Sequence, residues 1–145
     1  YLSDEYRRNW QAALSAAGPK PEQRLAALVE ADFSPQVCQP SWLYAWCAFW
    51  GESQHRPLYL EQCADNDSLQ IRAFEDACQR LVVNGGYDMD FRRAARVLRL
   101  TIEGVWLELM VSASPYPYEE AVSTAFFCAS MLFPRHFNET GLISR

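Results

Sequence analysis

We expect an all-α fold of six helices, and three observations predict it. Apolar residues recur at spacings of three and four almost throughout the 145 residues, which is the period of helices that bury one face. Strict alternation of apolar and polar residues, the pattern of a half-buried strand, is missing. Half of the residues are hydrophobic and 21% are charged, as in ordinary globular proteins. The length is that of one domain, and no apolar run approaches the roughly 20 residues that cross a bilayer.

Glycine and proline mark the ends of the first four helices. Residues 4–17 form the end of a helix stopped by the Gly-Pro pair that follows, since glycine suits the left-handed C-terminal position and proline cannot continue the hydrogen-bond ladder. A second helix spans residues 21–32. We place a third from residue 40 to about residue 54, and a long fourth from residue 57 to the Asn-Gly-Gly turn at 84–86. The second helix buries one face, made of Leu25, Leu28 and Val29.

The fifth helix is apolar on nearly every side. We expect Asp88 to cap it and Ser112 to end it, and a sixth helix to span residues 118–133 after a proline-rich turn. An all-round apolar helix needs cover on two sides. One stripe holds Leu98, Ile102, Val105 and Leu109, and the other holds Val97, Leu100, Gly104, Leu107 and Val111. Residues 135–145 show no strong pattern.

The sixth helix mixes alanine with larger side chains, a surface suited to close helix packing. A single layer of other helices could bury both helices, but a two-fold four-helix interface between two copies is the simpler solution. We therefore expect a homodimer. The predicted interface is Leu98, Ile102, Val105, Leu109, Val122, Ala125, Phe126 and Ala129.

Charge and cysteine content exclude several classes of protein. The net charge is −5, so this chain lacks the basic surface that grips nucleic acid. Five cysteines without a C-x-x-C pair indicate reduced thiols in a cytoplasmic protein. With only His55 and His136 as histidines, we expect no metal site and no cofactor. Nucleophile, phosphate-loop and metalloprotease motifs are missing too, so we do not expect an enzyme.

Residues 41–50 are the sharpest local signal, because five of the ten are aromatic. Taken singly, aromatic residues at helical spacing are usually core. Gathered on one cavity, however, their electron-rich faces suit a quaternary ammonium, which cannot donate hydrogen bonds and is attracted by ring quadrupoles. We predict that the cavity is bounded by the third, fourth and fifth helices. Its predicted rings are Trp46, Phe49, Trp50 and Trp106.

A carboxylate near these rings would stabilise a bound cation. Asp67 interrupts the apolar stripe of the fourth helix, and Glu103 lies one turn before Trp106 on the same face. Glu108 is a third candidate. Structural roles are equally open: Glu103 could pair with Arg99 or Arg96, and Asp67 could bond to a neighbouring helix.

The motifs resemble those of a known family. Residues 45–50 read A-W-C-A-F-W and are followed by H-R-P at 55–57; this resembles the A-W-x-A-F-W segment, with its downstream H-x-P, of TetR-family repressors of the glycine betaine pathway, the BetI type. Residues 103–107, E-G-V-W-L, resemble the family's D-G-L-W-L segment, with Glu103 in place of aspartate. Residues 22–25 match its E-Q-R-L. The resemblance runs from about residue 6 to residue 133.

The resemblance implies the C-terminal effector-binding and dimerisation domain of a transcriptional repressor. Residues 1–17 would end the helix that links to an absent N-terminal helix-turn-helix domain, and residues 18–145 would form the effector domain. The chain has no initiating Met and no signal-peptide pattern, so we expect that its N-terminus has been cut away. By resemblance, choline is the inducer, glycine betaine synthesis genes are the target, and operator DNA is bound only through the missing domain.

Two other interpretations stay open at this stage. The chain could be a helical dimerisation module of a TetR-like regulator that takes a different hydrophobic ligand or none, or, remotely, a small enzyme. If it is a sensor, we expect the first helix to carry the signal, because it leads toward the DNA-binding domain and can shift when a neighbouring cavity fills.

Overall fold

Six helices and a short hairpin make up the computed structural model, which describes residues 2–53 and 57–143. The all-α prediction is therefore confirmed. The elements are α1 (Leu2–Ala16), α2 (Pro21–Asp32), α3 (Pro40–Ser53), α4 (Pro57–Gly85), α5 (Phe91–Val111), α6 (Tyr118–Leu132), β1 (Phe137–Asn138) and β2 (Gly141–Leu142). Within the described residues, no helix is long and apolar enough to cross a bilayer.

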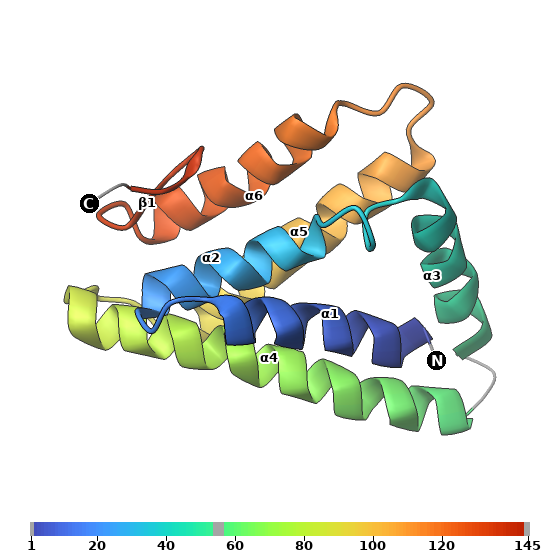
Figure 1. Cartoon of the computed structure of the whole chain (residues 1–145), viewed down its shortest axis with the longest axis horizontal. Coiled ribbons are helices and arrows are strands. Elements are labelled where there is room, and N and C mark those ends of the chain that lie inside the picture. Colours follow the sequence, from blue (N-terminus) through green and yellow to red (C-terminus); the bar gives the residue numbers. More distant parts are fainter. Residues whose placement is uncertain (1, 54–56, 144–145) are drawn as a thin grey trace.

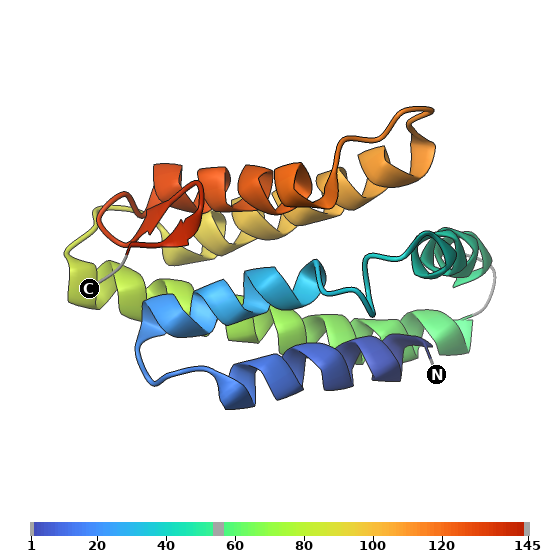
Figure 2. The ribbon, with the colours of Figure 1, turned by 45° about the horizontal axis from the view of Figure 1, so that its top comes forward.

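The helices form two packed layers with one helix across their end. α1, α2 and α4 lie side by side and contact one another (Figure 1). α5 packs on α4, and α6 packs on α5, so these two helices form the second layer (Figure 2). α3 runs across one end of the molecule, where it contacts α4 and α5. This end is where the first, third, fourth and fifth helices approach one another.

The core is built mainly from the central helix α2 and the helices that cover it. Leu25, Leu28 and Val29 have no exposed surface, which confirms the predicted buried face of this helix. Phe74 and Leu81 of α4 are equally buried. The i, i+3 and i+4 spacing of these residues explains why a sequence of mixed polarity adopts helices here.

The cap of α5 lies two residues later than we expected. Asp90, not Asp88, immediately precedes the helix, and its side chain accepts a 2.9 Å hydrogen bond from the backbone N–H of Arg92. A capping carboxylate reaches the free N–H groups of the first turn only from the residue that flanks the helix, so Asp88 is too far upstream. The preceding helix stops as expected, at Gly86 in the left-handed conformation (φ 66°).

Residues 135–143 form contacts that the sequence pattern did not predict. Residues 137–138 pair antiparallel with 141–142. Phe137 is 1% exposed and stacks on Phe126. The Tyr87 hydroxyl lies 2.7 Å from His136 Nδ1, and the Arg135 guanidinium lies 4.2 Å from the centre of the Tyr87 ring. We refer to Tyr87, Arg135 and His136 as the clasp, because they fasten the hairpin to the end of α4.

The two stripes of α5 have different surroundings. Most of the residues predicted for a dimer interface lie in the core of the protomer, because α5 packs on α4 and α6, and α6 packs on α5, α2 and the hairpin. Buried residues of this set are Leu98, Ile102, Val105, Ala125, Phe126 and Ala129, while Leu109 and Val122 are half-buried. The opposite stripe is exposed: Val97, Leu100, Leu107 and Val111 of α5, with Phe127 and Met131 of α6. We call these six exposed residues the outer face.

A candidate ligand pocket

A cavity of about 290 Å³ lies where the end of α2 meets helices α1, α3, α4 and α5. Four of the six residues predicted to bind a ligand lie on its wall: Trp46, Asp67, Glu103 and Trp106. The remaining lining residues are Tyr6, Asp32, Gln70, Arg99 and Ile102. Three distant helices therefore bring the predicted rings and carboxylates together, as the sequence suggested.

Three rings from three helices pack edge to face along one wall. Trp46 of α3 lies 5.6 Å from Tyr6 of α1, with ring planes 83° apart. The same tyrosine lies 5.9 Å from Trp106 of α5, at 80°. The two tryptophans are 7% and 6% exposed, so each ring contributes to the core and to the pocket wall at once.

The other aromatic residues of α3 lie behind this wall. Phe49 does not line the cavity; its ring packs on Trp46 at 5.5 Å and 86°. The ring centre of Trp42 lies 6.4 Å from that of Trp46, and the two ring planes are tilted by 43°. The side chain of Trp50, also predicted to bind, lies outside the described residues. Among the described aromatic side chains of this segment, Trp46 lines the cavity, and Trp42 and Phe49 pack against it.

Trp106 is fixed by a hydrogen bond as well as by packing. Its indole Nε1–H donates to the backbone carbonyl of Asp32 at 2.9 Å. This carbonyl belongs to the last turn of α2, where no intrahelical donor remains for it. The bond therefore satisfies a helix end and sets the orientation of a pocket ring. Glu103 lines the same cavity one turn earlier, as its spacing predicted, whereas Glu108 lies outside it.

Asp32 is one of the lining residues that the sequence did not predict, as are Tyr6, Gln70 and Ile102. It is 2% exposed, and its Oδ1 accepts a 2.5 Å hydrogen bond from the Tyr6 hydroxyl. Gln70 Nε2 lies 3.5 Å from the same oxygen and also donates to the Tyr6 hydroxyl. The one available signal was its position, since an acidic residue at a helix C-terminus opposes the helix dipole. Its burial, however, depends on three other helices.

Among the described residues, three carboxylates and one guanidinium line the pocket. Burial raises the pKa of Asp32 to about 7; the Tyr6 hydrogen bond opposes this shift and the negative charge of Glu103 adds to it. Burial also raises the pKa of Asp67 and of Glu103, and in both cases the nearby Arg99 guanidinium lowers it in part. Arg99 is thus the electrostatic partner of Asp67 and Glu103.

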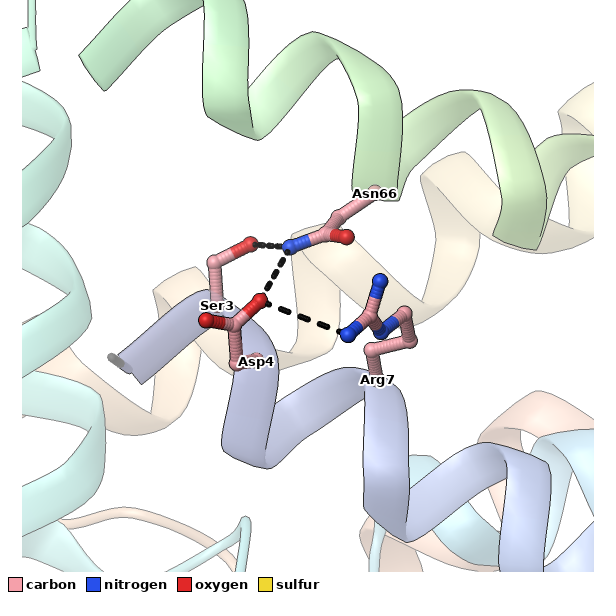
Figure 3. Close-up of polar contacts among 4 residues, drawn as sticks. All are labelled: Ser3, Asp4, Arg7 and Asn66. Atoms are coloured by element: carbon pink, nitrogen blue, oxygen red, sulfur yellow. Dashed lines mark hydrogen bonds and ion pairs between the residues drawn. The ribbon is translucent and has the colours of Figure 1, made fainter. Parts of the chain in front are cut away.

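The N-terminal end of α1 is fastened beside the pocket. Figure 3 shows the Asn66 amide of α4 donating to the Ser3 hydroxyl and, at 3.4 Å, to the Asp4 carboxylate. Arg7 pairs with Asp4 at 3.6 Å. Ser3 and Asn66 are buried. A polar contact between two buried side chains of different helices fixes their register, so α1 and α4 are held together at this level.

Two other cavities in the described part of the chain have a different lining. One of about 320 Å³ between α3, the end of α5 and the loop to α6 is lined mainly by apolar and tyrosine side chains, among them Leu43, Leu109 and Met110. Another lies along α1 and α2 and is lined largely by alanines. In the described part of the chain, no group of His, Cys, Asp and Glu side chains could hold a metal ion.

Comparison with known proteins gives one consistent picture. The family described as "BetI-type transcriptional repressor, C-terminal" matches residues 21–132. A regulator named HTH-type transcriptional regulator BetI, from Paraburkholderia xenovorans LB400, is 31% identical over 131 residues, which cover 80% of this chain and 59% of that protein. The protein of the same name from Pseudomonas aeruginosa PAO1 is 29% identical, covering 73% of this chain and 52% of that protein.

A solved structure has the same fold. A transcriptional regulator from P. aeruginosa PAO1 superposes with a TM-score of 0.77 at 26% identity, over 92% of this chain and 64% of that chain. The chain spans between half and three fifths of the length of the curated relatives it matches.

Proposed function

This chain belongs to the BetI-type transcriptional repressors, whose C-terminal domain it matches, and on that premise we propose that it senses choline or a related quaternary ammonium. Filling of the pocket would change the operator affinity of the whole repressor and so regulate glycine betaine synthesis genes. One observation carries this proposal: the rings of Trp46, Trp106 and Tyr6 share a cavity with three carboxylates and a single guanidinium.

The chemistry of the wall selects the class of ligand. A quaternary ammonium has a diffuse charge and no N–H, so it gains little from hydrogen-bond acceptors and much from ring faces and nearby negative charge. The pocket offers both, with a net negative charge when its acids are ionised. Its volume of about 290 Å³ is at the lower end of small-molecule sites, roughly 300–1,000 Å³, which favours a small ligand.

Self-association belongs to the same proposal. Six large apolar side chains of the outer face are exposed on α5 and α6, and an apolar patch of this kind on a soluble protein indicates a protein partner. A second copy presenting the same two helices would cover it symmetrically. The residues at the interface would therefore be the outer face rather than the stripe expected from sequence. DNA contact belongs to a helix-turn-helix domain in the full-length protein, which we place in the cytoplasm.

Titration of choline with tryptophan fluorescence and calorimetry tests the ligand proposal. Trp46→Leu and Trp106→Leu should each weaken binding by roughly 10- to 100-fold, because a desolvated cation–ring contact is worth about 2 kcal/mol. Tyr44→Leu is the matched control, since this residue is in the same helix, is 64% exposed and does not line the pocket. Undiminished affinity in the first two variants would return these rings to a purely structural role.

A second candidate has one observation in its favour. The cavity of about 320 Å³ near Leu43, Leu109 and Met110 would accept an uncharged apolar molecule, so the chain could be a dimerisation domain that answers to a hydrophobic ligand. Displacement of an apolar fluorescent probe separates the two candidates. Displacement by choline, lost in Trp106→Leu, supports the cation sensor; binding of apolar compounds that is weakened by Met110→Glu alone supports the second candidate.

A further inference from the structure

We propose that Asp32 is the principal counter-ion of the bound cation, and that the cation enters the pocket in exchange for a proton on this carboxyl group. This inference rests on the proposed function, since it assigns the residue that recognises the positive charge. It departs from the sequence-based expectation, which gave that task to Glu103 or Asp67. Three features of the pocket support it.

The first feature is the lack of a compensating charge. Asp32 is 2% exposed, and its partners are the neutral hydroxyl of Tyr6 and the amide of Gln70. Within the described residues, no arginine, lysine or histidine forms an ion pair with it. A buried carboxylate without a cation is costly, so such a group carries a proton or acquires a cation from outside.

The second feature is the contrast with the other two acids. Asp67 and Glu103 keep part of their surface in solvent, and although partial burial raises the pKa of both, the Arg99 guanidinium opposes that shift. Their charges are thus screened by water and offset by a resident cation. A ligand gains less from them than from a desolvated carboxylate such as that of Asp32.

The third feature is the position of Asp32 next to the rings. The Tyr6 ring packs on both Trp46 and Trp106 and carries the hydroxyl that bonds the Asp32 carboxylate. The Trp106 indole N–H is bonded to the backbone of the same aspartate. A cation that lies against these ring faces therefore lies beside Asp32.

The surroundings of Asp32 define how it can titrate. Elements α1, α4 and α5 and the loop after α2 all place groups near it. These titratable and charged groups are Tyr6 of α1, Cys38 of the loop, Asp67 of α4, and Arg99 and Glu103 of α5. The Tyr6 hydroxyl and the Cys38 thiol stay neutral near neutral pH, because burial and the charge of Asp32 raise the pKa of each. Asp32 is then the group that exchanges its proton in this range.

The exchange conserves charge inside the pocket. In the empty protein, burial holds the pKa of Asp32 at about 7, so below this pH the carboxyl is largely protonated. When a quaternary ammonium enters, its charge stabilises the carboxylate, the O–H bond of Asp32 breaks, and the proton passes to solvent and buffer. One cation replaces one proton, and Tyr6 keeps its role as hydrogen-bond donor.

Calorimetric titration of choline into the 145-residue chain tests this exchange. Below the pKa of Asp32, affinity should fall as protons compete; between about pH 7.5 and pH 5.5 we expect a loss of roughly 20-fold. Titrations in two buffers with different heats of ionisation count the released protons. The count should approach one near about pH 6 and vanish at about pH 8.5. A neutral isostere of choline, 3,3-dimethyl-1-butanol, should release none.

Variants assign the proton to its residue. Asp32→Asn keeps an oxygen that accepts from Tyr6 and removes the charge; we expect weaker binding, no proton release and a flat pH profile. Asp67→Asn and Glu103→Gln test the other two pocket acids, and proton release should persist in both. Asp76→Asn, on the exposed surface of α4 and outside the pocket, is the control in which affinity and proton release should both match the wild type. Choline binding without proton release in the wild type, or release that survives in Asp32→Asn, would overturn the inference while leaving the proposed function intact. Absence of choline binding at every pH would overturn both.

Discussion

The pocket and the outer face are opposite in character, and each is unusual in its own way. The pocket places a carboxylate where only 2% of the residue is exposed, and the outer face leaves Leu100, Leu107 and Val111 more than half exposed to water. A buried charge without a cation and an apolar patch without cover are both unfavourable in an isolated protomer. In the function we propose, a small cation would stabilise the first region and a second copy would cover the other.

One helix separates the two regions. α5 presents Arg99, Glu103 and Trp106 to the pocket and its exposed stripe to the outside. The proposed ligand pocket and the outer face thus use different sides of the same helix. Apolar composition alone does not locate an interface on α5, because other helices of the same chain already cover one of its two apolar stripes.

The largest expected effects on stability and on dimerisation come from placing a charge either in the buried side of α6 or on the outer face of α5. Ala125→Glu buries a carboxylate at a position with no exposed surface, so we expect the free energy of unfolding to fall by about 3–5 kcal/mol. Leu107→Glu should leave the protomer folded and weaken dimerisation by roughly 100-fold or more, because a dimer would bury that charge. Thermal unfolding followed by circular dichroism and sedimentation velocity measure the two effects.

Gln79→Glu, on the exposed surface of α4, controls for added charge and should change neither quantity. The distinction between the two regions fails if Leu107→Glu associates as the wild type does. It also fails if the wild type sediments as a monomer at high concentration.

The next effect is the pH dependence of stability in the empty protein. The pKa of Asp32 is about 7 when folded, above its ordinary value of 3.8, so the folded state binds the proton more tightly. This contribution is fully present below the ordinary pKa and is lost as the pH rises through 7. Between about pH 5 and pH 8 the free energy of unfolding should fall by about 2–3 kcal/mol.

Asp32→Asn should remove this part of the pH dependence, and urea unfolding at several pH values measures it. Asp76→Asn makes the same substitution on an exposed surface of α4 and should retain the wild-type dependence. Parallel pH profiles for wild type and Asp32→Asn would contradict a buried, titrating Asp32.

A smaller effect concerns the indole that joins the wall to α2. Trp106→Phe keeps an aromatic ring but removes the donor to the Asp32 carbonyl. We expect a loss of about 1–2 kcal/mol in the free energy of unfolding, since a buried acceptor is left unpaired. Trp42→Phe, outside the pocket, is the control. Equal stabilities of the two variants in urea would show that the bond has no structural weight.

The smallest effect tests the one positive charge of the pocket. Arg99→Gln removes a like charge from the neighbourhood of the ligand, so choline affinity should rise by about 2- to 5-fold. The gain should shrink at high salt, which screens exposed charges. Arg96→Gln, exposed on the same helix, is the control. A loss of choline affinity in Arg99→Gln would mean that the guanidinium contributes favourably to the ligand site.

Much of the fold followed from local pattern. The buried face of α2 and the shared face of Glu103 and Trp106 depend only on helical spacing, so the sequence predicted both. The cap of α5 was misplaced because Asp88 and Asp90 stand in one turn, and only the backbone decides which flanks the helix. The hairpin was missed because two-residue strands are too short to show alternation.

The site was harder to predict than the fold, because its critical residue is defined by packing. Asp32 looks like an ordinary helix end until α1 supplies Tyr6 and α4 supplies Gln70. Likewise, the sequence showed two apolar stripes on α5 but not which of them α4 and α6 would cover. Both gaps concern contacts between helices distant in the sequence, which periodicity does not encode.

The clasp has a practical consequence for where this protein can be shortened. Pro134 and the absence of a helical pattern beyond it make the end of α6 look like a natural place to stop. Yet in the last segment Phe137 covers Phe126. His136 also contacts Tyr87, which lies 49 positions earlier in the sequence, and so holds the segment against the end of α4. A chain trimmed at Phe133 would keep every helix but lose this cover, and its newly bared aromatic surface would favour aggregation during expression and storage.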